Sequence, residues 1–157
     1  MPEGKKLTPH LNALFETAET LNTSSNSINT ILQAVEQQLI KANIGLEVWL
    51  EEAAQRLSSS TSTRDTDDFT RFTYTELGFA RLRDGWHIAA RDFVVETDSQ
   101  GYEGEHVLTR EPYSLAQASR KERIEALRLL PDLIQALHAE ATKAINTIEE
   151  AKNLIVC

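Results

Sequence analysis

The segment FTRFTYTELGFARLRDGWHIAARDFVVET, residues 69–97, is rich in β-branched and aromatic residues on both sides of Asp84-Gly85. Aspartate followed by glycine is typical of two-residue hairpin turns, because these turns require positive φ angles. We therefore predict a β-hairpin whose strands span residues 69–83 and 86–97.

The predicted turn decides which side chains share a face of the hairpin, because it places Leu82 opposite His87. One face then carries Gly78, Ala80 and Ala89, whose small side chains leave a shallow row for a helix, and we expect this face to be the core. The opposite face gathers residue types that are enriched at protein interfaces. Together with the outer side of the preceding predicted strand, it forms a candidate interaction surface of Trp49, Leu77, Phe79, Arg81, Arg83, Trp86 and Ile88. Two interpretations are open for this surface: a partner covers it, or another part of the same chain does.

Apolar residues that precede the hairpin recur at alternating steps of four and three, from Leu7 to Ala42. This heptad spacing predicts a helix over residues 7–42 with a seam that another helix can fill. Six poor helix formers at residues 22–27 leave two alternatives, a continuous helix or a break at that point. A continuous helix would be longer than a compact globule of this mass is wide, so we expect an elongated molecule or a helix-to-helix seam.

A second heptad pattern closes the chain and predicts a helix over residues 114–155. Ser119 and Glu122 have the spacing of a capping box near its start. We expect Pro131 to kink this helix, because proline removes one backbone hydrogen bond and crowds the preceding turn. Since the hairpin returns the chain toward its start, we expect the two helices to pack antiparallel within one chain. Association of copies through the seam is the alternative.

The remaining segments complete one predicted domain over residues 1–157. Residues 44–51 alternate between apolar and polar and predict a strand, residues 52–68 predict a mobile loop, and residues 105–110 predict a last short strand. The expected fold is α+β, with two long heptad-patterned helices, N- and C-terminal, packed on a small antiparallel β-meander of three to four strands. This layout resembles that of prefoldin-type chaperone subunits in order and approximate length, and no residue role is carried over from it.

Composition limits the partners that the chain can have. Its 157 residues include 16 Lys and Arg against 24 Asp and Glu, which gives a formal net charge of -8. This acidic balance argues against a nucleic-acid partner, because neutralisation of phosphates supplies most non-specific affinity.

The single cysteine, Cys157, rules out an internal disulfide and fits a reducing compartment. No stretch approaches the ~20 apolar residues of a membrane span, so we expect a soluble, cytoplasmic protein that uses no membrane.

Residues that could carry chemistry are few. No two of the four histidines have the i, i+4 spacing of a helical zinc site, so we expect no metal and no other cofactor. His87 has the best case for catalysis, and as a general base it would need a carboxylate partner such as Glu76 or Asp92. We assign no catalytic residue, and an enzyme with a His-carboxylate site is the third of three hypotheses.

The leading hypothesis is a non-enzymatic protein-interaction or scaffold module that binds another protein or a second copy of itself. It would use the candidate interaction surface on the sheet and the helical seams. The second hypothesis is a small acidic chaperone or adaptor that holds an extended or unfolded client in an apolar groove between helices and sheet.

Overall fold

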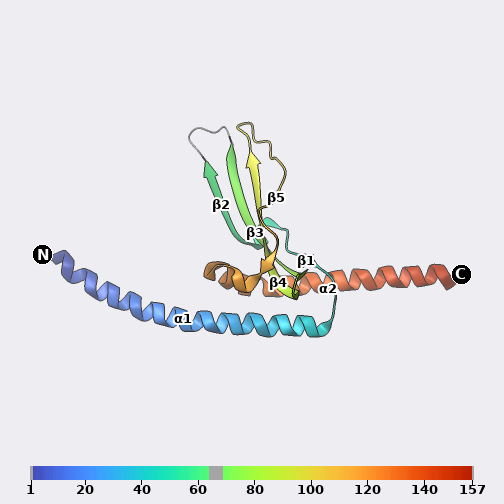
Figure 1. The fold of residues 1–157 in the computed structure, drawn as a ribbon, viewed down its shortest axis with the longest axis horizontal. Coiled ribbons are helices and arrows are strands. Elements are labelled where there is room, and N and C mark those ends of the chain that lie inside the picture. Colours follow the sequence, from blue (N-terminus) through green and yellow to red (C-terminus); the bar gives the residue numbers. More distant parts are fainter. Residues whose placement is uncertain (1, 64–68, 157) are drawn as a thin grey trace.

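The computed structural model describes residues 2–63 and 69–156. Within these ranges the chain forms two long helices, α1 (Pro2–Ala42) and α2 (Arg120–Val156), and an antiparallel sheet of six strands. The fold is therefore α+β. The first part of α1 projects to one side of a central region, and the last part of α2 projects to the other side. The sheet rises from that centre (Figure 1).

Helix α1 is continuous through residues 22–27, which agrees with the first of the two alternatives. Thr17, Thr20 and Thr23 each donate a side-chain hydrogen bond to the carbonyl four residues earlier. Such back-bonding satisfies the hydroxyl within the helix at a slight cost in stability, and it often bends the helix axis. The ribbon of α1 is correspondingly curved in Figure 1.

Helix α2 begins at Arg120 rather than near residue 114, because a short 3₁₀ turn, η2 (Leu115–Gln117), precedes it. The predicted capping box forms at its start. The Ser119 hydroxyl accepts from the amide of Glu122 at 3.2 Å, and the Glu122 carboxylate accepts from the amide of Ser119 at 3.3 Å. The helix continues through Pro131 to Val156 as a single element.

The two long strands are β3 (Thr70–Leu82) and β4 (Gly85–Thr97). Strands β1 (Val48–Trp49) and β2 (Arg56–Thr63) pair with β3, while β5 (Val107–Leu108) and β6 (Tyr113–Ser114) pair with β4. The strands predicted over residues 44–51 and 105–110 thus form, but each is only two residues long.

The predicted mobile loop over residues 52–68 is wrong for most of its length. It contains the short helix η1 (Ala53–Gln55) and strand β2, while residues 64–68 lie outside the described residues. Strand β2 has almost no apolar side chains, yet its backbone pairs with β3 from Ser58 to Thr63. Ladder hydrogen bonds to a neighbouring strand supply the stabilisation that composition alone did not reveal.

The hairpin turn lies one residue earlier than predicted. Leu82 pairs with Gly85, so Arg83 and Asp84 form the turn and His87 pairs with Ala80. This register differs by two residues from the expected one. Because side chains alternate with a period of two, each residue keeps its predicted face.

The identity of the core face was predicted wrongly. Leu77, Phe79 and Ile88 are buried beneath the helices and join one hydrophobic cluster with side chains of α2. These helical members are Ala126, Leu129, Leu130, Leu133 and Leu137. Large side chains remove more apolar surface from water than the alanines and glycine of the other face, which explains why the helices cover this side.

On the opposite face of the sheet, Trp49 of β1 covers the part of β3 around Gly78. The indole lies directly on Gly78, where an added Cβ would come within 2.3 Å of the ring and 2.6 Å of the Val48 carbonyl oxygen. The Arg91 guanidinium stacks over the indole at 4.4 Å, and its Nε donates to Glu76 at 2.8 Å. Glycine is therefore required at position 78 for close approach.

The two helices run in the same direction, so the expected antiparallel packing is wrong. Arg120 at the start of α2 donates to Asn22, and Arg123 donates to Asn29 further along α1. Both ribbons proceed from left to right in Figure 1. The reason is that the ribbon of strands returns the chain beside the middle of α1, and α2 then runs alongside the remainder of that helix.

In the described part of the chain, no helix is both long and apolar enough to cross a membrane.

Candidate functional site

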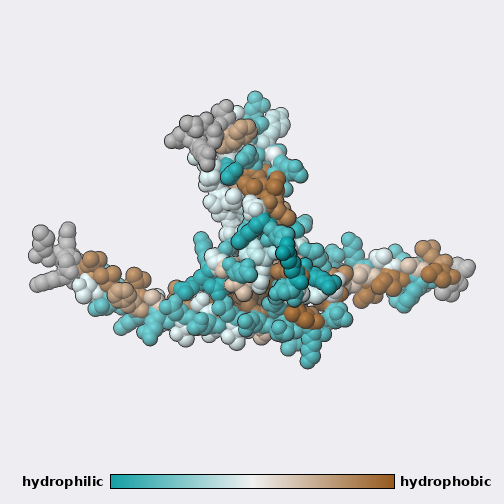
Figure 2. Space-filling view, in the orientation of Figure 1, coloured by the Kyte–Doolittle hydropathy of each residue, from teal (hydrophilic) through white to brown (hydrophobic). Residues whose placement is uncertain are grey.

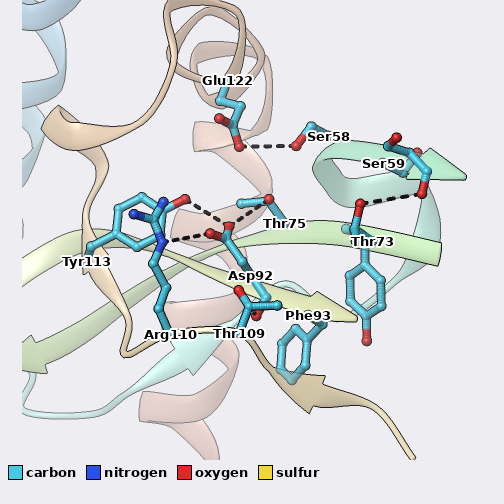
Figure 3. A pocket seen from close by; sticks show the side chains of 12 residues that line it. Ser58, Ser59, Thr73, Thr75, Asp92, Phe93, Thr109, Arg110, Tyr113 and Glu122 are labelled. Carbon is cyan, nitrogen blue, oxygen red and sulfur yellow. Dashed lines mark hydrogen bonds and ion pairs between the residues drawn. The ribbon is translucent and has the colours of Figure 1, made fainter. Parts of the chain in front are cut away.

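A polar cleft of about 330 Å³ lies between the sheet and the start of α2. Asp92 on β4 is at its centre (Figure 3). Its Oδ1 accepts from the Thr75 hydroxyl and from the Tyr113 hydroxyl, both at 2.8 Å, and its Oδ2 accepts from Arg110 Nε at 2.9 Å. Ser58 of β2 donates to Glu122 of α2 across the same cleft at 3.1 Å.

The contacts in the cleft hold the loop after β5 against the sheet. Burial and the hydrogen bond to Asp92 raise the pKa of Tyr113 to about 12, and the Arg110 guanidinium stacks on the tyrosine ring at 3.7 Å. The three hydrogen bonds occupy most of the roughly four acceptor sites of the carboxylate and link it to β3 and to the segment that follows β5. The geometry therefore favours a structural role for Asp92.

His87 lies between two carboxylates that were not its predicted partners. Its Nδ1 is 2.5 Å from Glu36 of α1 and its Nε2 is 2.9 Å from Asp84 in the turn. Burial raises the pKa of Glu36 above its usual value of 4.5, and His87 partly offsets this effect. The predicted partners are engaged elsewhere, Glu76 with Arg91 and Asp92 in the polar cleft. The cluster connects α1 to the hairpin turn.

The hollow beside this cluster is small. It has a volume of about 110 Å³ and is lined by residues of α1, β4 and η2, among them Leu32, Glu36 and Ile88. A binding pocket for an ordinary small ligand occupies ~300 Å³ or more, so this hollow is smaller than such a pocket. In the described residues, no group of three or more His, Cys, Asp or Glu side chains could hold a metal ion.

The predicted interaction surface divides into three parts. Leu77, Phe79 and Ile88 are buried by the helices of the same chain, so these three are not available to a partner. Trp49 and Trp86 are half-buried, the latter stacked on Phe79 with ring centroids 5.3 Å apart. Arg81 and Arg83 are exposed, and Arg83 is 3.5 Å from Glu111.

Among the described residues, about half of the exposed large apolar side chains lie on two helix segments, and the others are spread over the sheet and the rest of the helices. We define the α1 arm as residues 7–21 and the α2 arm as residues 141–155; both project beyond the central body (Figure 1). Large apolar side chains are exposed along both arms, as the brown atoms in Figure 2 show. They are Leu7, Leu11, Leu14, Phe15 and Leu21 on the α1 arm, and Ile145, Ile148, Leu154 and Ile155 on the α2 arm.

Both stripes continue seams that are filled within the body. On α1 the heptad positions after the arm, from Ser25 through Leu32 to Leu39, are buried or half-buried against the rest of the chain. On α2 the buried positions end at Leu137, a single turn before the α2 arm. Each helix thus has one half that packs against the rest of the chain, with Ile134 of α2 as an exposed exception at 46%, and one half whose large apolar side chains face solvent.

Comparison with known proteins assigns no relatives. No family model matches the chain, and no curated protein and no solved structure is similar enough to be matched to it.

Proposed function

We propose that this protein is a non-enzymatic interaction module that docks amphipathic helices on its two arms. The observation that supports this proposal is the exposed leucine and isoleucine stripe on each arm, which prolongs a seam that the body already fills with side chains of its own. Contiguous apolar surface of this kind on a protein marks an interaction site. A cytoplasmic location and the absence of nucleic-acid and membrane partners belong to the same proposal.

The helical state of the arms supports docking for a second reason. Isolated helices of about 15 residues are marginal in water, because nucleation is costly and packing supplies most helical stability. Each arm is about this length and makes its heptad seam from apolar residues. Association with another helix would provide the tertiary packing that the arms lack in the single chain.

Peptide binding and hydrogen exchange test the proposal together. The probe is a fluorescein-labelled 21-residue peptide with leucine at both heptad seam positions, titrated with the intact chain while its anisotropy is followed. We expect binding that is lost in the Leu11→Asp/Leu14→Asp variant. Binding should be retained in Ala13→Asp, which adds a charge on the side of the α1 arm away from the seam.

Hydrogen exchange of the arms covers the case in which another copy already occupies them. Amides of the arms should gain protection either with the peptide or with rising concentration of the chain itself. Arms that exchange as fast as an unfolded peptide under both conditions, with no change in anisotropy, would contradict the proposed function.

A further inference from the structure

We propose that the α2 arm docks on the α2 arm of a second copy of this chain, so that two copies pair antiparallel, tail to tail. This inference rests on the proposed function, since it identifies the partner of one of the two arms. The α1 arm stays available for a different helix.

The position of the α2 arm leaves room for this partner. Burial of α2 side chains in the core ends at Leu137, and the helix then continues beyond the body (Figure 1). An antiparallel α2 arm approaches from the free end of the helix, and its own body lies beyond that end. The paired arms therefore separate the two bodies, which do not overlap.

The heptad steps of the arm allow one register. The seam positions are Ala141, Ala144, Ile148, Ala151 and Ile155. With the twofold axis between residues 149 and 150, Ile148 faces Ala151 of the second copy, and Ala144 faces its Ile155. A shift of one heptad toward the body would bring the second copy's Ile155 onto Leu137, which the chain's own core already covers. The opposite shift would leave only the last two seam positions in contact.

The side chains in this register are complementary in size. Each layer pairs an alanine with an isoleucine, and a small residue opposite a large one lets two helices approach closely and interdigitate. A parallel pair would instead place like residues together, alanine on alanine and isoleucine on isoleucine. It would also bring both bodies to the same level on the seam side, where each chain already packs on its own α2. The antiparallel pair is therefore favoured.

The residues that flank the seam are covered in the same arrangement. Ile145 and Leu154 lie on its two sides and are 57% and 82% exposed in the single chain. In an antiparallel pair of heptad helices, like flanking positions face each other, so Ile145 meets the aliphatic stem of Lys152 and Leu154 meets Thr147 of the second copy. The glutamates at residues 149–150 lie on the side of the helix away from the seam.

Charge distinguishes the α2 arm from the α1 arm as a surface for self-association. The α2 arm contains two lysines and two glutamates, so two α2 arms meet without net repulsion. The α1 arm contains two glutamates and neither lysine nor arginine, so two α1 arms would bring like charges together. The overall charge of -8 is therefore no obstacle to the proposed contact, while it disfavours an anionic membrane surface as the occupant.

The size of the exposed surface suits a dimer of moderate affinity. The large apolar side chains of the α2 arm expose on the order of 500 Å² per chain, so a pair buries on the order of 1,000 Å², the lower end of the range for specific interfaces. The contact also continues the intrachain seam of α2, which the body fills as far as Leu137. We therefore expect a dimer that dissociates on dilution.

Sedimentation velocity over a range of concentrations gives the first test. We expect Ile148→Asp to be predominantly monomeric at a concentration at which the wild type is dimeric. The matched control Asn146→Asp places the same charge outside the seam and should remain dimeric, as should Leu14→Asp on the other arm. Circular dichroism of each variant establishes that the body is folded.

Cysteine cross-linking tests the register and the direction. Ala144→Cys and Ile155→Cys, each in a Cys157→Ser background, are mixed in equal amounts and oxidised. We expect a disulfide between unlike chains, and much less product when either variant is oxidised alone, because like positions lie far apart along an antiparallel pair. Efficient linkage between two Ala144→Cys chains would show a parallel pair and contradict the proposal.

The remaining outcomes separate this inference from the proposed function. A monomer at all concentrations that still binds the heptad peptide would overturn the dimer and leave the proposed function standing. A dimer that survives Ile148→Asp and is lost in Leu14→Asp would assign self-association to the α1 arm and overturn the inference. A monomer that binds no peptide, with arms that exchange as fast as an unfolded peptide, would contradict both.

Discussion

The two halves of each long helix have the same heptad pattern but different surroundings. In the body half of α2, the seam residues Leu130 and Leu137 are buried in the core, whereas Ile148 in the α2 arm is 54% exposed. The same contrast separates Leu32 from Leu14 on α1. A heptad repeat therefore predicts that a seam exists, but only the tertiary structure reveals whether the chain fills it.

The largest effect on the free energy of unfolding should separate the two halves when one leucine in each is replaced by alanine. Leu133→Ala should lower the free energy of unfolding by about 2–5 kcal/mol, because it leaves a cavity in the core. Leu14→Ala should change it by less than about 0.5 kcal/mol when the chain is monomeric. Urea denaturation at a low protein concentration measures both values, and equal losses would mean that the arm is packed within the single chain.

A smaller effect is expected where the body closes over Gly78. Gly78→Ala should cost about 1–3 kcal/mol, because its Cβ would overlap both the Trp49 ring and the Val48 carbonyl. The control Gly104→Ala lies outside the body, and its Cβ would meet only the Glu96 carbonyl at 3.3 Å. Thermal unfolding should rank Gly78→Ala as the less stable variant. The penalty should shrink in a Trp49→Ala background, and an undiminished penalty would exclude the indole as its cause.

The smallest effect concerns the alkaline pH dependence of the body. Since the pKa of Tyr113 is raised to about 12, its contribution to stability is fully present below pH 10 and is lost as the pH rises toward 12. The difference in phenolate absorbance between the wild type and Tyr113→Phe reports this titration. Its midpoint should fall toward 10.0 in Asp92→Asn, and a midpoint already near 10.0 in the wild type would contradict the polar cleft.

The sequence contained enough information for the main elements of the fold. The heptad steps from Leu7 and the alternation around Asp84-Gly85 correctly predicted two long helices and a long hairpin. Strand β2 was missed, because a run of serine and threonine carries no apolar alternation and is stabilised by pairing with β3. The direction of α2 was also missed, since it depends on where the ribbon of strands returns the chain.

The candidate site was less accessible to sequence reasoning. Leu77, Phe79 and Ile88 were correctly placed on one face, but their pattern could not decide between a partner and an internal helix. The contact of Thr75 with Asp92 follows from the true register, in which these two residues are paired, and a two-residue error concealed it. Glu36 was unpredictable as a partner of His87, because 51 residues separate them and no motif connects them.

The common direction of the two helices has a mechanical consequence. The beginning of α1 and the end of α2 lie at opposite extremes of the molecule (Figure 1). Tension applied between these points pulls α1 toward its first residue and α2 toward its last, so that the row of side chains between them is loaded in shear. Many contacts must then slide together before any of them separates, and the body should resist stretching along its long axis more strongly than peeling from one end.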